Sequence, residues 1–174
     1  MKGLVHIYCG DGKGKTSAAL GLAVRAAGRG LRVLIVRFLK NDDSGEVPVL
    51  GGIPGITVLP CVRSFGFVSR MSEEEKQEAA AWFDSLFSDA CDRAVREDYD
   101  VLVCDELVGA CSLGMVDETA VLDFLRNRPE KLEVVLTGRG PSQKLLEMAD
   151  YVSEITMRKH PYTAGVAARR GIEY

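Results

Sequence analysis

The amino-acid sequence predicts an α/β protein: a doubly wound, mostly parallel sheet with helices on both faces. Short, continuously apolar segments alternate along the chain with helical segments, as they do in successive βαβ units. A Gly-Lys-Thr sequence follows the first apolar segment, and an Asp-Glu pair follows a later one. Both placements put polar groups at the carboxyl ends of strands, where sheets of this class bind ligands.

The first strand–helix–strand unit can be followed from the N-terminus. Residues 4–9 form a short apolar segment that ends at Gly10, and the Ala- and Leu-rich residues 16–27 predict a helix that ends at Gly28. Residues 32–38 predict a second strand with a continuously apolar middle. Such a strand suits a sheet that is covered on both faces.

The middle of the chain changes character. Residues 40–70 are rich in Gly and Pro, and we expect a long irregular segment of functional importance with one short strand near residues 56–59. Ser72 and Glu75 then form a capping box, which predicts the start of a helix. The apolar residues of this helix lie on one stripe between residues 79 and 94, so we expect that face to pack on the sheet.

The last third of the chain continues the alternation. We expect strands at residues 101–104 and 133–136, helices at 117–127 and 142–148, and a final strand-like segment at 151–157. No repeat or linker interrupts this order. The 174 residues are therefore expected to form a single domain, residues 1–174.

Composition excludes several classes of protein. Hydrophobic residues make up 47% of the chain, charged residues 27%, and the net charge is −3, so we expect neither nucleic acid nor membrane as a partner. The five cysteines are an odd number without a C-x-x-C pair, which argues against a disulfide framework or a zinc site. We expect a cytoplasmic protein whose thiols stay reduced.

The sequence "CGDGKGKTS", residues 9–17, resembles a phosphate-binding P-loop but is one residue short. The usual pattern is G-x-x-x-x-G-K-[ST], and here Cys9 stands where the first glycine is expected. The strand–loop–helix context nevertheless favours phosphate binding over a plain turn. We expect Lys15 to contact phosphate, Thr16 to approach Mg²⁺, and the rest of the loop, Gly10, Asp11, Gly12, Lys13, Gly14 and Ser17, to surround the phosphate.

Two further strands end in polar residues. "VLVCDE" ends in Asp105 and Glu106, an arrangement similar to a Walker B motif, and either carboxylate could hold Mg²⁺ directly or through water. "LTGRG" places Arg139 on the same edge of the sheet, where its guanidinium could grip phosphate. Plain structural roles remain open for both, as a cap for Asp105 and as a surface side chain for Arg139.

Several motifs do not occur. No N-K-x-D or D-x-x-G sequence is placed as in a GTPase, and no catalytic base is evident near the loop. The absence of a base is unusual for a kinase but suits an enzyme whose nucleophile belongs to the substrate. His6 lies within a strand, where a packed or edge position explains it better than catalysis, and His160 lacks partners at metal-ligand spacing.

Taken together, the motifs resemble the ATP:corrinoid adenosyltransferases of cobalamin biosynthesis and salvage. The resemblance covers nearly the whole chain and rests on "GDGKGKTSAALGLAVRAAGRG", "VLVCDEL", "VLTGRG", "ADYVSEI" and "KHPYTAGVAARRGIEY". It implies a RecA-like P-loop fold and a homodimer. It also implies transfer of the 5′-deoxyadenosyl group of ATP to the Co(I) of a reduced corrinoid, with release of triphosphate.

The resemblance also implies roles for individual residues and partners. Lys15, Thr16 and Glu106 would be the catalytic residues, with Thr16 and Glu106 holding Mg²⁺ or Mn²⁺, while Asp105 and Arg139 would lie on the ATP side. An electron donor such as a flavoprotein would supply the reduced corrinoid.

The corrinoid side departs from the family pattern. Where better-known relatives have G-F-T-W, thought to displace the lower ligand of cobalt, this chain has "GFVS", residues 66–69. Phe67 is kept and the tryptophan is lost. Phe65 and Phe67 are the expected corrinoid contacts, although both could instead be ordinary anchors of the loop.

Two other functions stay open on the sequence alone. One is a P-loop kinase or ATPase that transfers the γ-phosphoryl group. The other is a binding module that responds to nucleotide without turnover.

Overall fold

The fold is built on a six-stranded sheet in which every strand pair is parallel. The computed structural model describes residues 2–40 and 44–173. The strands are β1 (Val5–Cys9), β2 (Val33–Arg37), β3 (Ile56–Val58), β4 (Val101–Asp105), β5 (Glu133–Thr137) and β6 (Tyr151–Glu154). Their order in the sheet is β3-β2-β4-β5-β1-β6. The predicted α/β class and parallel sheet are therefore confirmed.

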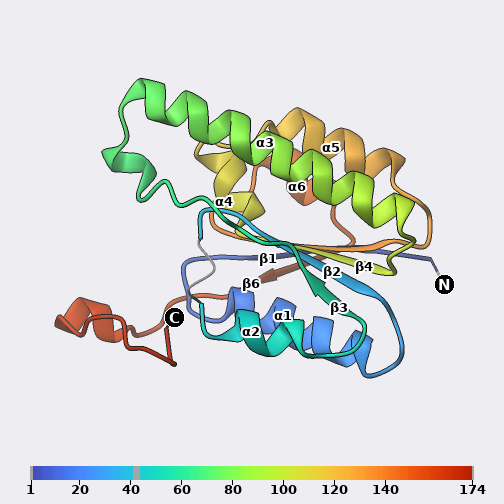
Figure 1. Ribbon diagram of the computed structural model, residues 1–174. Helices are drawn as coiled ribbons and strands as arrows, with labels where there is room; N and C mark the ends of the chain where they lie inside the picture. Colours follow the sequence, from blue (N-terminus) through green and yellow to red (C-terminus); the bar gives the residue numbers. More distant parts are fainter. Residues whose placement is uncertain (1, 41–43, 174) are drawn as a thin grey trace.

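Helices cover both faces of this sheet, as predicted (Figure 1). On one face lie α1 (Lys15–Ala27) and α2 (Glu46–Gly51); on the other lie α3 (Glu73–Arg96), α4 (Leu107–Ser112), α5 (Glu118–Asn127) and α6 (Gln143–Met148). Each face has its own apolar core. The core strands β2 and β4 are buried along their whole length, which is why their sequences read as unbroken apolar runs.

The predicted starts of α3, α5 and α6 are confirmed to within one residue, and each has a side-chain cap. Ser72 accepts a hydrogen bond from the Glu75 N–H, and the Glu75 carboxylate accepts one from the Ser72 N–H, so the capping box is complete. Asp117 and Ser142 cap α5 and α6 through their side-chain oxygens. The polar residue before each apolar run therefore marked its helix correctly.

Two short helices were not predicted from the sequence. Helix α2 lies inside the segment 40–70 that was expected to be irregular, and it contains Pro48 in its first turn, where the missing N–H costs no helical bond. Helix α4 directly follows β4, and four of its six residues are buried. A buried helix of this length shows no amphipathic period, so the pattern could not reveal it. Residues 41–43 of the same segment lie outside the described residues, as do Met1 and Tyr174.

The remaining features are short. The described residues contain two 3₁₀ turns, η1 (Val68–Arg70) and η2 (Pro161–Ala164). After β6 the chain runs through residues 155–173 as an exposed tail that extends away from the sheet (Figure 1). In the part of the chain that the structure describes, no helix combines the length and apolarity needed to cross a membrane. The five cysteines are all free.

Candidate functional site

The loop between β1 and α1 is shaped by a close approach to the chain that follows β6. A Cβ atom on Gly10 would lie 2.5 Å from the Ile155 carbonyl oxygen, and one on Gly12 would lie 2.7 Å from the same atom. The Gly12 N–H donates a hydrogen bond to this oxygen over 2.7 Å. By contrast, a Cβ on Gly14 would meet nothing within 4 Å. The first two glycines are therefore required by packing, and the space around Gly14 is open.

Helix α1 presents its N-terminus to a pocket. Its N-cap is Gly14, in the left-handed region with φ of 119°, and no side chain caps the helix. The first turn contains no acidic residue. The backbone N–H groups and the positive end of the helix dipole are therefore available to an anion, as the P-loop pattern predicted.

Lys15 lies at the base of this loop and is only 7% exposed. Its ammonium donates hydrogen bonds to the carbonyl oxygens of Gly10 and Gly12, each over 2.8 Å. Burial lowers the pKa of Lys15, and the nearby Glu106 carboxylate opposes that shift. An ammonium fixed in this position can donate to phosphate oxygens that bind at the loop.

Asp105 is the buried centre of the site, with no exposed surface. Its Oδ1 accepts hydrogen bonds from the Thr16 hydroxyl at 2.8 Å and the Thr137 hydroxyl at 2.7 Å. Its Oδ2 accepts one from the Lys40 ammonium at 2.8 Å. Strand β5 lies between β1 and β4, which explains why Thr137 reaches the carboxylate that β4 carries. The acidic residue of "VLVCDE" thus lies directly against the P-loop threonine.

Glu106 follows Asp105 and has a strained backbone. It is a non-glycine residue with φ of 61°, it forms the N-cap of α4, and its N–H donates to the Thr137 hydroxyl over 2.9 Å. Its side chain lines the pocket. Among the described residues, the carboxylate that accepts the hydrogen bond of the Thr16 hydroxyl is that of Asp105 and not that of Glu106. Left-handed residues of this kind cluster at functional sites because the surrounding structure must compensate their cost.

The "TGRG" sequence has two separate roles. A Cβ on Gly138 would lie 2.3 Å from the Gly109 nitrogen, so this glycine allows α4 to pack on the end of β5. Arg139, which follows it, lines the pocket, and its Nη2 lies 3.4 Å from the Asp11 carbonyl oxygen that it faces. The predicted arginine is therefore at the pocket, next to the P-loop.

An aromatic loop forms the opposite wall. Phe65 is partly buried and packs against Trp82 and Phe83 of α3, with ring centroids 5.8 and 5.6 Å apart. Phe67 is 73% exposed. The Arg63 guanidinium lies 4.9 Å from the Phe65 ring centroid, and that of Arg70 lies 5.5 Å from the Phe67 ring centroid. Phe65 is thus anchored in the loop, whereas Phe67 offers its ring to solvent.

Besides the contact at Ile155, the exposed tail lies against the P-loop at two further points. The Asp11 carboxylate accepts a hydrogen bond from the Met157 N–H, which is the main reason its pKa is lowered. The Lys13 ammonium donates to the Glu173 carboxylate at 2.9 Å and to the Ile172 carbonyl oxygen at 3.0 Å. Hydrogen bonds from Arg169 and from Lys13 hold the pKa of Glu173 far below its usual range.

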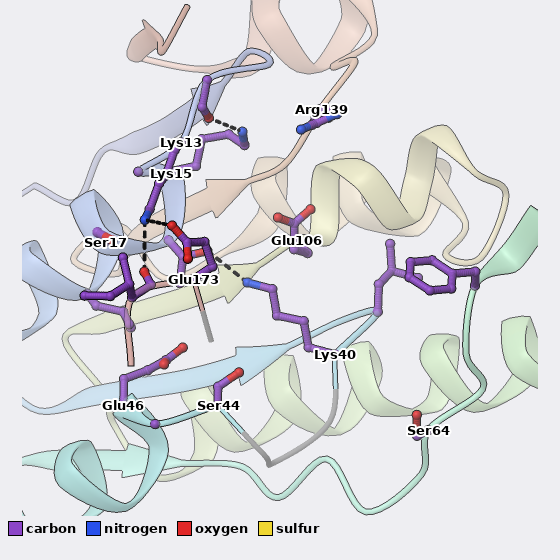
Figure 2. A pocket seen from close by; sticks show the side chains of 18 of the residues that line it. Lys13, Lys15, Ser17, Lys40, Ser44, Glu46, Ser64, Glu106, Arg139 and Glu173 are labelled. Carbon is purple, nitrogen blue, oxygen red and sulfur yellow. Dashed lines mark hydrogen bonds and ion pairs between the residues drawn. The ribbon is translucent and has the colours of Figure 1, made fainter. Parts of the chain in front are cut away.

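These walls enclose one cavity of about 900 Å³. Figure 2 shows Lys15, Lys40, Glu106 and Arg139 around it, each from a different segment. Of the residues expected at the site, all line the cavity except Gly10 and Asp105. The expected residues that line it are Asp11, Gly12, Lys13, Gly14, Lys15, Thr16, Ser17, Phe65, Phe67, Glu106 and Arg139.

The residues fit a magnesium ion of the P-loop type. No group of three or more His, Cys, Asp or Glu side chains among the described residues could hold a metal alone. Mg²⁺ at phosphate sites needs only one or two protein oxygens, because phosphate and water supply the rest. The Thr16 hydroxyl and the Asp105 carboxylate already bind one cation, because both accept a hydrogen bond from the Lys40 ammonium.

Sequence reasoning missed three contributors to the site. Lys40 follows β2 at the carboxyl edge of the sheet, a position that could have flagged it, but it carries no motif. Thr137 belongs to the "TGRG" motif, which we used only for its arginine. Glu173 lies 160 residues from Lys13 in sequence, and no local pattern could have paired them.

The comparisons with known proteins agree with one another. A family model described as "ATP:corrinoid adenosyltransferase BtuR/CobO/CobP" matches residues 1–174. The corrinoid adenosyltransferase of Pseudomonas aeruginosa is 33% identical over 99% of this chain and 84% of its own length. That of Escherichia coli K12 is 34% identical over 99% of this chain and 86% of its own.

Solved structures give weaker likenesses. The cytoplasmic domain of the Thermomonospora curvata Type VII secretion ATPase EccC has a TM-score of 0.47 and 15% identity, over 94% of this chain and 21% of that one. A likeness this low bears on neither the site nor the function.

Proposed function

Because this chain belongs to the ATP:corrinoid adenosyltransferase family, and is therefore a corrinoid adenosyltransferase, we propose how its pocket performs the transfer. The triphosphate of ATP lies on the N-terminus of α1, bound by residues 10–17 with Arg139 at its side. The corrinoid lies on the aromatic loop with Phe65 and Phe67. The observation that carries this assignment is that a single cavity joins the two surfaces.

In the reaction, the Co(I) of the corrinoid attacks C5′ of the ATP ribose. A Co–C bond forms with the electron pair of cobalt, and the C5′–O bond breaks with its pair leaving on the triphosphate. Negative charge therefore grows on the leaving group. Lys15 and the N–H groups of the loop lie where they would stabilise that charge. A protein base is not needed, because no proton has to leave the nucleophile.

We propose that Thr16 and Glu106 hold the divalent cation of the site, with Asp105 fixing the Thr16 hydroxyl. A bound Mg²⁺ would neutralise charge on the departing triphosphate. The hydrogen bond from Thr16 to the buried Asp105 supports the position of the hydroxyl, and the strained Glu106 supports a dedicated role for its carboxylate.

The surface proposed to bind the corrinoid, the aromatic loop with Phe65 and Phe67, lacks the tryptophan of the family pattern. Phe67 keeps the family phenylalanine, and Trp82 of α3 backs Phe65 from behind rather than replacing the missing tryptophan of "GFVS". We further propose a homodimer. The edge strand β6 supports it, because Tyr151 and Val152 are about half exposed there.

Three further assignments belong to this proposal. The 174 residues act as one catalytic domain. A reducing, cytoplasmic location suits the five free thiols. A separate electron donor, such as a flavoprotein, supplies the reduced corrinoid.

Product analysis tests the proposal. With ATP, Mg²⁺ and chemically reduced corrinoid, we expect one triphosphate for each Co–C bond, the latter followed by absorbance. ADP as the product would instead indicate γ-phosphoryl transfer. Binding of both ligands without a Co–C bond would indicate a binding module.

A further inference from the structure

The Lys40 side chain occupies a position that no sequence motif assigned to it. Its ammonium donates to the Thr16 hydroxyl over 2.9 Å and to Asp105 Oδ2 over 2.8 Å. Thr16 in turn donates to Asp105 Oδ1, so the three groups close a triangle of hydrogen bonds. A hydroxyl and a carboxylate of this kind are also the groups that approach the metal in P-loop proteins.

Burial makes this ammonium a necessary counter-ion. Asp105 has no exposed surface, and a buried carboxylate without a compensating positive charge is strongly disfavoured. Among the described residues, its carboxylate accepts hydrogen bonds from two hydroxyls and from Lys40, and the Lys40 ammonium is the charged donor of the three. The Lys40 side chain itself is 29% exposed and can therefore withdraw toward the cavity.

The other two lysines of the pocket are engaged elsewhere. Lys15 donates to carbonyl oxygens of its own loop, and Lys13 pairs with Glu173 of the tail. The backbone also directs Lys40 inward, because the preceding Leu39 takes a left-handed conformation with φ of 56° that turns the chain after β2. A turn with this cost is expected only where the surrounding structure requires it.

We propose that Lys40 is the resident cation beside the metal position: it neutralises Asp105 before substrate arrives, and it competes with a divalent ion for the Thr16 hydroxyl that both would contact. The inference rests on the proposed metal site. It follows that a divalent ion alone binds weakly, and that ATP, which adds phosphate ligands for the metal and an anion for the displaced ammonium, is needed for metal entry.

The test is a titration of the nucleotide-free protein with Mn²⁺, followed by electron paramagnetic resonance. Two like charges about 4 Å apart near a protein surface repel by several kcal/mol, so Lys40→Met should bind Mn²⁺ at least about tenfold more tightly than the wild type. The matched control is Lys13→Met, which removes the same charge from the same pocket. It should change the Mn²⁺ affinity far less. The difference between the two variants measures the competition between the Lys40 ammonium and Mn²⁺, apart from the general loss of one positive charge.

Equal gains in Lys40→Met and Lys13→Met would overturn the proposal, as would tight Mn²⁺ binding by the nucleotide-free wild type. If Lys40→Met is too unstable to titrate, the melting temperature of Lys40→Gln replaces the titration. Mn²⁺ should raise that temperature more than it raises the wild type's, and equal shifts would contradict the competition.

A failure of the metal site itself gives a different result. Asp105→Asn should weaken Mn²⁺·ATP binding, and an unchanged affinity would fault the proposed metal site. A normal effect of Asp105→Asn without any gain in Lys40→Met faults the role of Lys40 alone.

Discussion

The two walls of the cavity are built in contrasting ways. The nucleotide wall consists of strand ends and the N-terminus of α1, and the groups that support it, Lys15 and Asp105, are buried and hydrogen-bonded. The corrinoid wall consists of the aromatic loop, residues 63–67, and its most exposed ring, Phe67, is 73% accessible. The first wall is formed by the fold itself, whereas the second depends on segments outside the sheet.

This difference has a physical cause. A small, highly charged triphosphate needs donors that are fixed beforehand, because reorganising them during the reaction would cost part of the catalytic effect. A corrinoid is large and partly apolar, so its binding gains from exposed rings that it can cover. Substitutions on the first wall should therefore affect the rate, and substitutions on the second should affect corrinoid binding.

The largest effect is expected for Lys15→Ala. Removal of a fixed cation from the developing charge of the triphosphate should lower kcat by about 10²–10³-fold. Steady-state kinetics with saturating corrinoid and ATP measures it. Lys13→Ala removes a more exposed cation of the same loop, which pairs with the tail, and should lower kcat far less. Unchanged turnover in Lys15→Ala would contradict the role of the nucleotide wall.

Asp105→Asn should reduce both stability and activity. The amide cannot accept from Thr16, Thr137 and Lys40 as the carboxylate does, and a mismatched buried group costs about 1–3 kcal/mol of unfolding free energy. Activity should fall by about 10–100-fold because Thr16 loses its support. Urea unfolding and kcat are the measurements. If Asp105→Asn were as stable and as active as the wild type, the proposed role of Asp105 in supporting Thr16 would be wrong.

A pair of substitutions sharpens the contrast within the corrinoid wall. Phe65→Ala should cost about 1–2 kcal/mol of unfolding free energy, because the ring is partly buried against Trp82 and Phe83. Phe67→Ala should change stability by less than about 0.5 kcal/mol. It should raise the KM for the corrinoid about three- to tenfold without changing the KM for ATP. The reverse pattern would mean that Phe67 is the anchor and Phe65 the contact.

The smallest effect is expected for Glu173→Gln. The ion pair with Lys13 lies at the surface, so its loss should change the KM for ATP by no more than about twofold. Hydrogen bonds from Arg169 first, and then from Lys13, lower the pKa of Glu173 in the folded protein. The interactions of its carboxylate therefore stabilise the tail above the ordinary Glu pKa of 4.5 and are lost only as the pH falls well below that value. Proteolysis of the tail as a function of pH measures this. Release of the tail near pH 5 would contradict the assignment.

Sequence and structure agree best where chemistry repeats locally. The strands, the capping box at Ser72 and the Gly-Lys-Thr turn each depend on neighbouring residues, and each was predictable. Lys40 was not, because its role depends on a carboxylate 65 positions away. Helix α2 was hidden by Pro48, which usually marks an irregular segment. The corrinoid wall depends on the path of a long loop, which no periodic pattern constrains.

The contact of Gly10 and Gly12 with the Ile155 carbonyl has a consequence for engineering the protein. The shortened loop packs against the chain that leaves β6. The conformation of the loop near the N-terminus therefore depends on residues near the C-terminus. A truncation after β6, or a graft that replaces the tail with that of a relative, would take away the support of the nucleotide loop while leaving every P-loop residue in place. Chimeras of this enzyme should therefore exchange the first strand, its loop and the final strand together.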